Sequence, residues 1–130
     1  MARLIDAAAA MKNDYELAGL LVTVPKGQRV SPAAFAALFK AVETVESDYE
    51  RGRVLGEVAR STAATPDALV QVTRATLTTK RDYERANVLV AVGRRGPVDT
   101  SLRKAYMEAA ERTKSDYEQN RLLAALAKAA

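Results

Sequence analysis

The sequence predicts an all-α protein, an α-solenoid of four 34-residue helix-turn-helix repeats with about eight helices. The first observation is the triplet Asp-Tyr-Glu, which begins at residues 14, 48, 82 and 116 and so recurs every 34 residues. The second is an Ala-rich composition with only 5% aromatic residues, which favours closely packed helices. The third is the spacing of apolar residues by three or four positions, the pattern of one helix face.

The period divides residues 1–130 into one repeat domain whose units span 1–30, 31–64, 65–98 and 99–130. The first helix of a unit is predicted at 32–45, 66–79 and 100–113, and in the first unit it starts at Met1 within the pattern. A residue suited to capping a helix start precedes each of the three later helices, namely Ser31, Thr65 and Asp99.

An apolar stripe identifies the inner face of the first helix most clearly in the second unit, where it consists of Phe35, Leu38, Phe39, Val42 and Val45. One position of this helix holds Ala in every unit: Ala7, Ala41, Ala75 and Ala109. A small residue repeated at one internal position predicts a close approach between two helices.

The triplet marks the start of the second helix, predicted at 48–60 in the second unit. Ser47 with Glu50, and Ser115 with Glu118, match a capping box in which each side chain bonds the other residue's backbone N–H. Arg81 breaks this box in the third unit. The structural motif comprises Asp14, Tyr15, Glu16, Asp48, Tyr49, Glu50, Asp82, Tyr83, Glu84, Asp116, Tyr117 and Glu118.

Burial of the motif tyrosine against the first helix is the expected core contact of each unit. Counted from the Asp as position 0, apolar residues follow at positions +6, +7 and +10, and the Tyr at +1 is grouped with them. On this interpretation Tyr83→Ala costs roughly 3–5 kcal/mol of stability, as aromatic truncations in cores do.

Composition argues against catalysis. The chain has neither His nor Cys, which removes the commonest general base, the commonest metal ligand and all thiol chemistry. The Asp and Glu of the triplet diverge by about 200° on a helix, so they cannot act as a pair. We therefore expect a protein that is not an enzyme and has no cofactor or metal.

The repeated triplet resembles the "SDYE" repeats that follow the membrane portion of some bacterial antibiotic-sensor-type metallopeptidases. This resemblance is carried by Ser47–Glu50 with Val54 and Leu55, by Asp82–Glu84 with Val88 and Leu89, and by Ser115–Glu118 with Leu122 and Leu123. The resemblance implies a HEAT-like stack of helical hairpins, extracytoplasmic in a bacterial membrane protein. The 34-residue period is also similar to that of the tetratricopeptide repeat, with Ala18 and Ala86 at its usual small position.

A binding scaffold for a protein or peptide is the expected function, because open helical stacks present an extended surface. Positions +2, +5, +9 and +12 of the second helix are predicted to face solvent. The candidate partner-binding residues taken from them are Arg53, Asn87, Arg121, Arg60 and Arg94. The +12 cations also complement the helix dipole, which is the structural interpretation of that position.

Nucleic acid is the alternative partner. The net charge is +4, from 20 basic and 16 acidic residues, and the third unit carries a basic group of Lys80, Arg81, Arg85, Arg94 and Arg95. No apolar run is long enough for direct membrane insertion. Because neither end has a polar capping unit, we expect a segment of a longer chain, or end-to-end self-association.

Overall fold

Seven α-helices make up most of the described chain in the computed structural model, which describes residues 13–26, 30–95 and 98–129. They are α2 (Asp14–Leu21), α3 (Pro32–Val42), α4 (Asp48–Arg60), α5 (Pro66–Ala75), α6 (Asp82–Gly93), α7 (Thr100–Glu111) and α8 (Asp116–Ala129), with a 3-10 turn, η1 (Thr76–Thr78), after α5. The predicted all-α fold is confirmed. The helix expected from Met1 lies outside the described residues.

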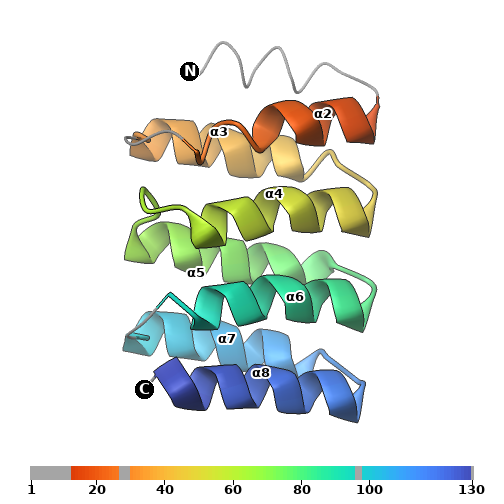
Figure 1. Ribbon diagram of the computed structural model, residues 1–130, viewed down its shortest axis with the longest axis vertical. Helices are drawn as coiled ribbons and strands as arrows, with labels where there is room; N and C mark the ends of the chain where they lie inside the picture. The colour runs from red at the N-terminus through yellow and green to blue at the C-terminus, as the bar shows by residue number, and fades with distance from the viewer. Residues whose placement is uncertain (1–12, 27–29, 96–97, 130) are drawn as a thin grey trace.

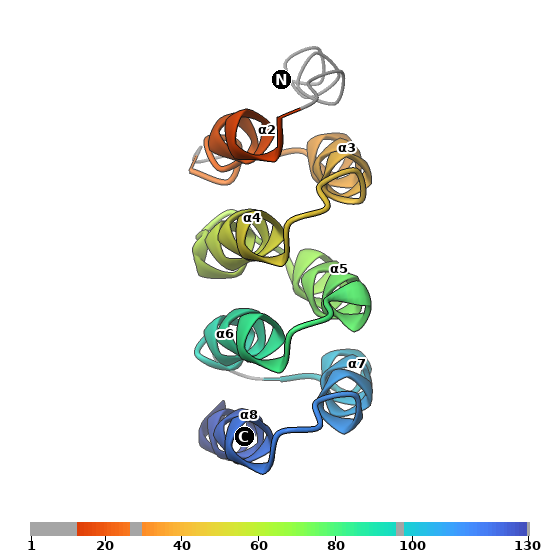
Figure 2. The same cartoon turned by 90° about the vertical axis from the view of Figure 1, so that its right-hand side faces the viewer.

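The helices stand in two parallel columns (Figures 1 and 2). The second helices of the units, α2, α4, α6 and α8, form one column and are called the B helices. The first helices, α3, α5 and α7, form the other column and are called the A helices. Each B helix packs on the next B helix, and α5 packs on α7 in the same way. Within the described residues, none of these helices is both long and apolar enough to span a membrane.

The helix starts follow the predicted caps. Ser31 and Thr65 accept the backbone N–H three residues on at 3.1 Å, and Asp99 does so at 2.8 Å. Arg81 provides no side-chain cap for α6, as the broken capping box predicts. The A helices end two to four residues earlier than expected because their last turns tighten: after α3, for example, Val45 N–H bonds the Val42 carbonyl.

The core lies between the two columns. Positions +6, +7 and +10 of α4 and α6 point into it: Val54, Leu55 and Val58 of α4 are buried, as are their counterparts in α6. In α8, by contrast, the +7 residue Leu123 is exposed. From the A helices, Phe35, Leu38 and Val42 are buried as the apolar stripe predicts, while Phe39 is half-buried. Isolated helices of this length are marginal in water, so this shared burial stabilises them.

The Asp of the triplet joins each unit to the next. One oxygen, Oδ2, accepts two backbone N–H groups at the turn that precedes the following B helix. Asp14 accepts from Glu46 and Ser47 at 3.1 and 2.8 Å, and Asp48 accepts from Lys80 and Arg81 at 3.0 Å each. Asp82 repeats the arrangement with Lys114 and Ser115 at 2.9 and 2.7 Å. These Asp residues therefore hold two successive B-helix starts in register.

The expected capping box is correct in only one half. Ser47 Oγ accepts the Glu50 N–H at 3.2 Å, and Ser115 accepts from Glu118 at 3.3 Å. The Ser N–H, however, donates to the Asp of the preceding unit instead of the Glu carboxylate. The Glu carboxylate is left to pair with an Arg on its own helix.

The prediction that the motif tyrosines are buried is wrong. Their exposed fractions are 69% for Tyr15, 57% for Tyr49, 60% for Tyr83 and 71% for Tyr117. The tyrosine that does lie in the core is Tyr106 of α7, which is 0% exposed and donates its hydroxyl to the Leu122 carbonyl at 2.7 Å. Burial raises the pKa of the Tyr106 phenol above its ordinary value, so the hydroxyl keeps the proton that it donates.

Two Tyr→Ala substitutions should therefore differ sharply. Tyr106→Ala is expected to cost about 3–5 kcal/mol, because it removes a fully buried ring and opens a cavity. Tyr83→Ala should cost less than about 1 kcal/mol, because surface substitutions are mostly mild. Urea titrations of the two variants measure this contrast, and similar losses at both positions would contradict the assigned orientation of α6.

Removal of one inter-unit carboxylate tests its contribution to stability. Asp48→Ala should lower the free energy of unfolding by about 1.5–3 kcal/mol, because two charge-assisted hydrogen bonds are lost. Asp48→Asn keeps an acceptor oxygen and should lose less. Asp116 has the same place in its helix but accepts no inter-unit bond among the described residues. Asp116→Ala should therefore cost only about 0.5 kcal/mol through the helix dipole. Equal losses of unfolding free energy in Asp48→Ala and Asp116→Ala would show that the helix dipole, and not the inter-unit hydrogen bonds, accounts for the effect.

Candidate interaction surface

One surface of the B-helix column presents the same residue positions in every unit. Positions +1, +5 and +12 lie within about 40° of each other around a helix, so they share one face. We call this surface the B-helix face. It is formed by Tyr15, Tyr49, Tyr83 and Tyr117 at +1, by Gly19, Arg53, Asn87 and Arg121 at +5, and by Arg60, Arg94 and Lys128 at +12. Lys26, the +12 residue of the first unit, follows the end of α2 and is not assigned to this face.

A row of tyrosines runs along the first turn of the B helices, one to a unit. Because each ring is more than half exposed, the row is not needed for core packing. Neighbouring units also meet here: the Arg53 guanidinium carbon lies 5.6 Å from the centre of the Tyr15 ring, within cation–π range. The row thus combines aromatic rings with a cation at its edge.

The predicted contact residues at position +5 form a second row beside the tyrosines. Arg121 of α8 donates to the Asn87 side chain of α6 at 3.2 Å, so two of these residues touch across a unit boundary. Arg53 pairs with Glu50 at 2.6 Å, and Arg121 pairs with Glu118 at 2.5 Å. The structure places these side chains in a row, as expected, with much of their charge balanced locally.

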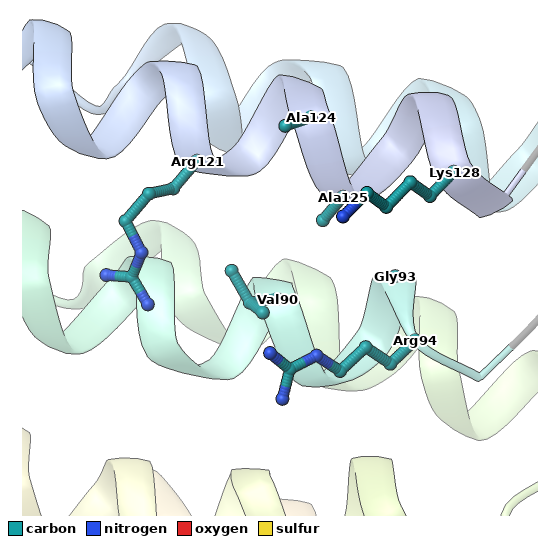
Figure 3. Close-up of a pocket in the computed structure, with 7 residues that line it drawn as sticks. All are labelled: Val90, Gly93, Arg94, Arg121, Ala124, Ala125 and Lys128. Carbon is teal, nitrogen blue, oxygen red and sulfur yellow. The ribbon is translucent and has the colours of Figure 1, made fainter.

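The basic residues of position +12 lie at the opposite ends of the B helices. Arg60 and Arg94 are exposed, and Arg60 bonds Glu57 at 3.1 Å. Two adjoining hollows open on the B-helix face between α4, α6 and α8, with volumes of about 510 and 410 Å³. Figure 3 shows Arg94 and Lys128 running along their helices beside the smaller hollow while Arg121 reaches from α8 toward α6.

The exposed stripe of the B helices is rotated around the helix axis relative to the stripe predicted from the sequence. Positions +2 and +9 were expected on it, but in the second to fourth units they are half-buried or buried. They turn toward the preceding B helix: a Cβ on Gly52 of α4 would lie 3.5 Å from the Glu84 carboxylate of α6. Position +1, the tyrosine, occupies the exposed face in their stead.

Polar residues at position +3 have a role that the sequence analysis missed. Arg85 is 5% exposed and donates from Nε to the Thr76 carbonyl at 3.0 Å, with a further bond to the Thr79 carbonyl. It also reaches the Arg112 carbonyl at the end of α7 at 3.2 Å. Arg51 and Gln119 make similar bonds at helix ends, to Ala75 and Ala110 respectively. Position +3 therefore satisfies carbonyls that A helices leave unpaired.

The basic group expected in the third unit does not form one patch. Arg85 is buried, and half-buried Arg95 donates to the Ala64 carbonyl at 3.3 Å. Arg81 precedes α6 and Arg94 follows it, so the helix separates them by roughly 18 Å. Arg85 in particular is not available to a phosphate.

Comparison of the chain with family models, curated proteins and solved structures found no match. In the described part of the chain, no group of three or more acidic side chains is placed to hold a metal ion. The arrangement of the B-helix face is therefore the basis for assigning a function.

Arg85→Ala should lower the free energy of unfolding by about 2–4 kcal/mol, because it leaves buried carbonyls without donors. Arg85→Lys should recover part of this loss, since Lys keeps a charged donor. Arg94→Ala, at an exposed cation on the same helix, should change stability by no more than about 0.5 kcal/mol. Chemical denaturation of the three variants measures these differences, and a mild effect of Arg85→Ala would refute the capping role.

Proposed function

We propose that the chain is a non-catalytic scaffold that binds a protein or peptide on the B-helix face. The observation that carries this proposal is the row of four tyrosines, each 57–71% exposed. A large aromatic side chain that is more than half exposed and repeated once in every unit is suited to contact another molecule. Tyr and Arg are also the residue types most enriched in the energetic centres of protein interfaces.

Local pairing on this face supports the same proposal. The Glu50–Arg53 and Glu118–Arg121 pairs hold long side chains in fixed positions beside the tyrosines. A surface ordered before binding loses less conformational entropy when a partner arrives. The Asp-mediated contacts between units add to this order, because they fix the spacing from one tyrosine to the next.

Single-stranded nucleic acid is the second candidate partner. The exposed tyrosines favour it, because aromatic rings beside cations are the platforms on which unpaired bases stack. The intervening Glu side chains and the division of the third unit's cations disfavour a continuous phosphate track. Protein or peptide therefore ranks first.

The double variant Tyr49→Ala/Tyr83→Ala tests the proposed surface. Proteins captured from a cell extract by the native chain are identified and purified, and their affinities are then measured by calorimetry. The double variant should bind its partner at least about 2 kcal/mol less tightly, as expected for interface tyrosines. Met107→Ala, at an exposed apolar residue of α7, is the matched control and should bind like the native chain.

Two results would reject this assignment. A partner whose affinity is unaffected by the double variant would bind elsewhere on the chain. Tight binding of a labelled oligodeoxythymidylate, lost in the double variant and with no protein partner captured, would favour the nucleic-acid candidate.

A further inference from the structure

The two hollows on the B-helix face form one continuous depression. The smaller lies between α6 and α8 and the larger extends to α4, and they share Val90, Arg94 and Arg121. Both extend toward the C-terminal ends of these helices from the +5 residues Asn87 and Arg121, and no tyrosine lines either of them. Their further lining residues are Gly93, Ala124, Ala125 and Lys128 in the smaller, and Arg60, Asn87, Ala91 and Arg95 in the larger.

Small residues give this depression an apolar floor. A Cβ on Gly93 would lie 3.1 Å from the Ala125 side chain, so α6 and α8 approach closely at this point. Because Val90, Ala124 and Ala125 are short, the space above them is not filled by the protein's own side chains (Figure 3). Such a floor is suited to a small or aliphatic side chain of another molecule.

The walls of the depression are cationic. Arg60, Arg94, Arg95, Arg121 and Lys128 line it, and neither hollow has an acidic residue in its lining. Glu57 and Glu118 balance Arg60 and Arg121. Arg94 and Lys128 form no ion pair within the described residues, and the Nε of Arg95 is buried without a hydrogen-bond partner. Positive charge is therefore in excess here.

We propose that this depression binds an acidic peptide segment of the partner protein. In this arrangement an aliphatic side chain rests on Val90 and Ala124, and flanking carboxylates meet Arg94 and Lys128. The inference rests on the proposed scaffold function and defines the chemistry of its partner. Charge complementarity of this kind sets specificity and speeds association.

An acidic peptide fits the depression better than a nucleic acid does. An apolar floor offers nothing to a sugar–phosphate chain, whereas it matches an aliphatic side chain. The cationic depression lies at the α4, α6 and α8 helices only, while Glu50 and Glu84 lie beside the tyrosine half of the face. A phosphate backbone that followed the whole column would pass these carboxylates and be repelled.

Short fluorescein-labelled peptides measure this binding by fluorescence anisotropy. The first is composed of Glu, Ala and Leu; in the second Lys replaces every Glu, and in the third Ser replaces every Leu. The first should bind with a Kd of about 1–100 μM, weaken with added salt, and bind at least tenfold more tightly than the other two.

Variants assign the binding to the depression. Arg94→Gln/Lys128→Gln should weaken binding of the first peptide about tenfold or more, because charged hydrogen bonds are lost. The matched control Arg103→Gln/Lys104→Gln removes the same charge from exposed positions of α7 and should change binding less than about twofold. Circular dichroism melts verify that both double variants remain folded.

Three results would overturn the inference. These are a Kd weaker than about 1 mM for the first peptide, equal losses in both double variants, and tighter binding of oligodeoxythymidylate with the same dependence on Arg94 and Lys128. If any of these results is obtained and a protein partner still depends on the tyrosine row, the proposed scaffold function stands, but the depression is not its acidic-peptide site. If the peptide binds as expected but no partner depends on the tyrosines, the depression is supported as a binding site and the tyrosine row is rejected as one.

Discussion

The carboxylate at the start of each B helix is the contact on which the spacing of the units depends. A single oxygen of Asp14, Asp48 or Asp82 accepts two consecutive backbone N–H groups some 32 and 33 residues ahead. Those N–H groups belong to the turn that opens the next B helix, where the helix itself offers no acceptor. One side chain therefore satisfies these two N–H groups, places negative charge at its own helix start and sets the position of the following unit.

Side-chain packing then stabilises the arrangement of units that these hydrogen bonds set. Small residues let successive B helices approach, as Gly93 and Ala125 show, and the apolar residues at +6, +7 and +10 fill the space between the two columns. The buried donor Arg85 bonds carbonyls at the ends of the two A helices on either side of it, α5 and α7. The inward positions of a B helix are committed in this way, while its outward face makes only surface contacts between units, such as Arg121 with Asn87. That face is where the tyrosines, the +5 residues and the +12 cations lie.

Much of the fold could be predicted from the sequence, because the period and the caps are local signals. Ser31, Thr65 and Asp99 begin their helices as expected, and the all-α class is confirmed. The tyrosine error was avoidable: at 100° per residue, position +1 lies about 180° from the buried position +10. Hydrophobicity alone places Tyr with Leu, whereas its angle around the helix places it on the opposite side. The buried Arg85 also left a signal, since position +3 falls within the apolar arc. No sequence signal indicates the hydrogen-bond partners of the Asp oxygens, because these partners are backbone groups of a distant turn.

For the scaffold function proposed above, the regular exposure of the tyrosines has a consequence for how strongly a partner would be held. Each unit adds one equivalent contact at a fixed interval, so a partner that engages several units gains affinity by avidity and not through any single strong contact. A partner with its own regular spacing could slide by one unit and keep most of those contacts. The positions that differ between units, such as Gly19, Arg53 and Asn87 at +5, break this degeneracy. Register on this surface is therefore decided by the residues that do not repeat.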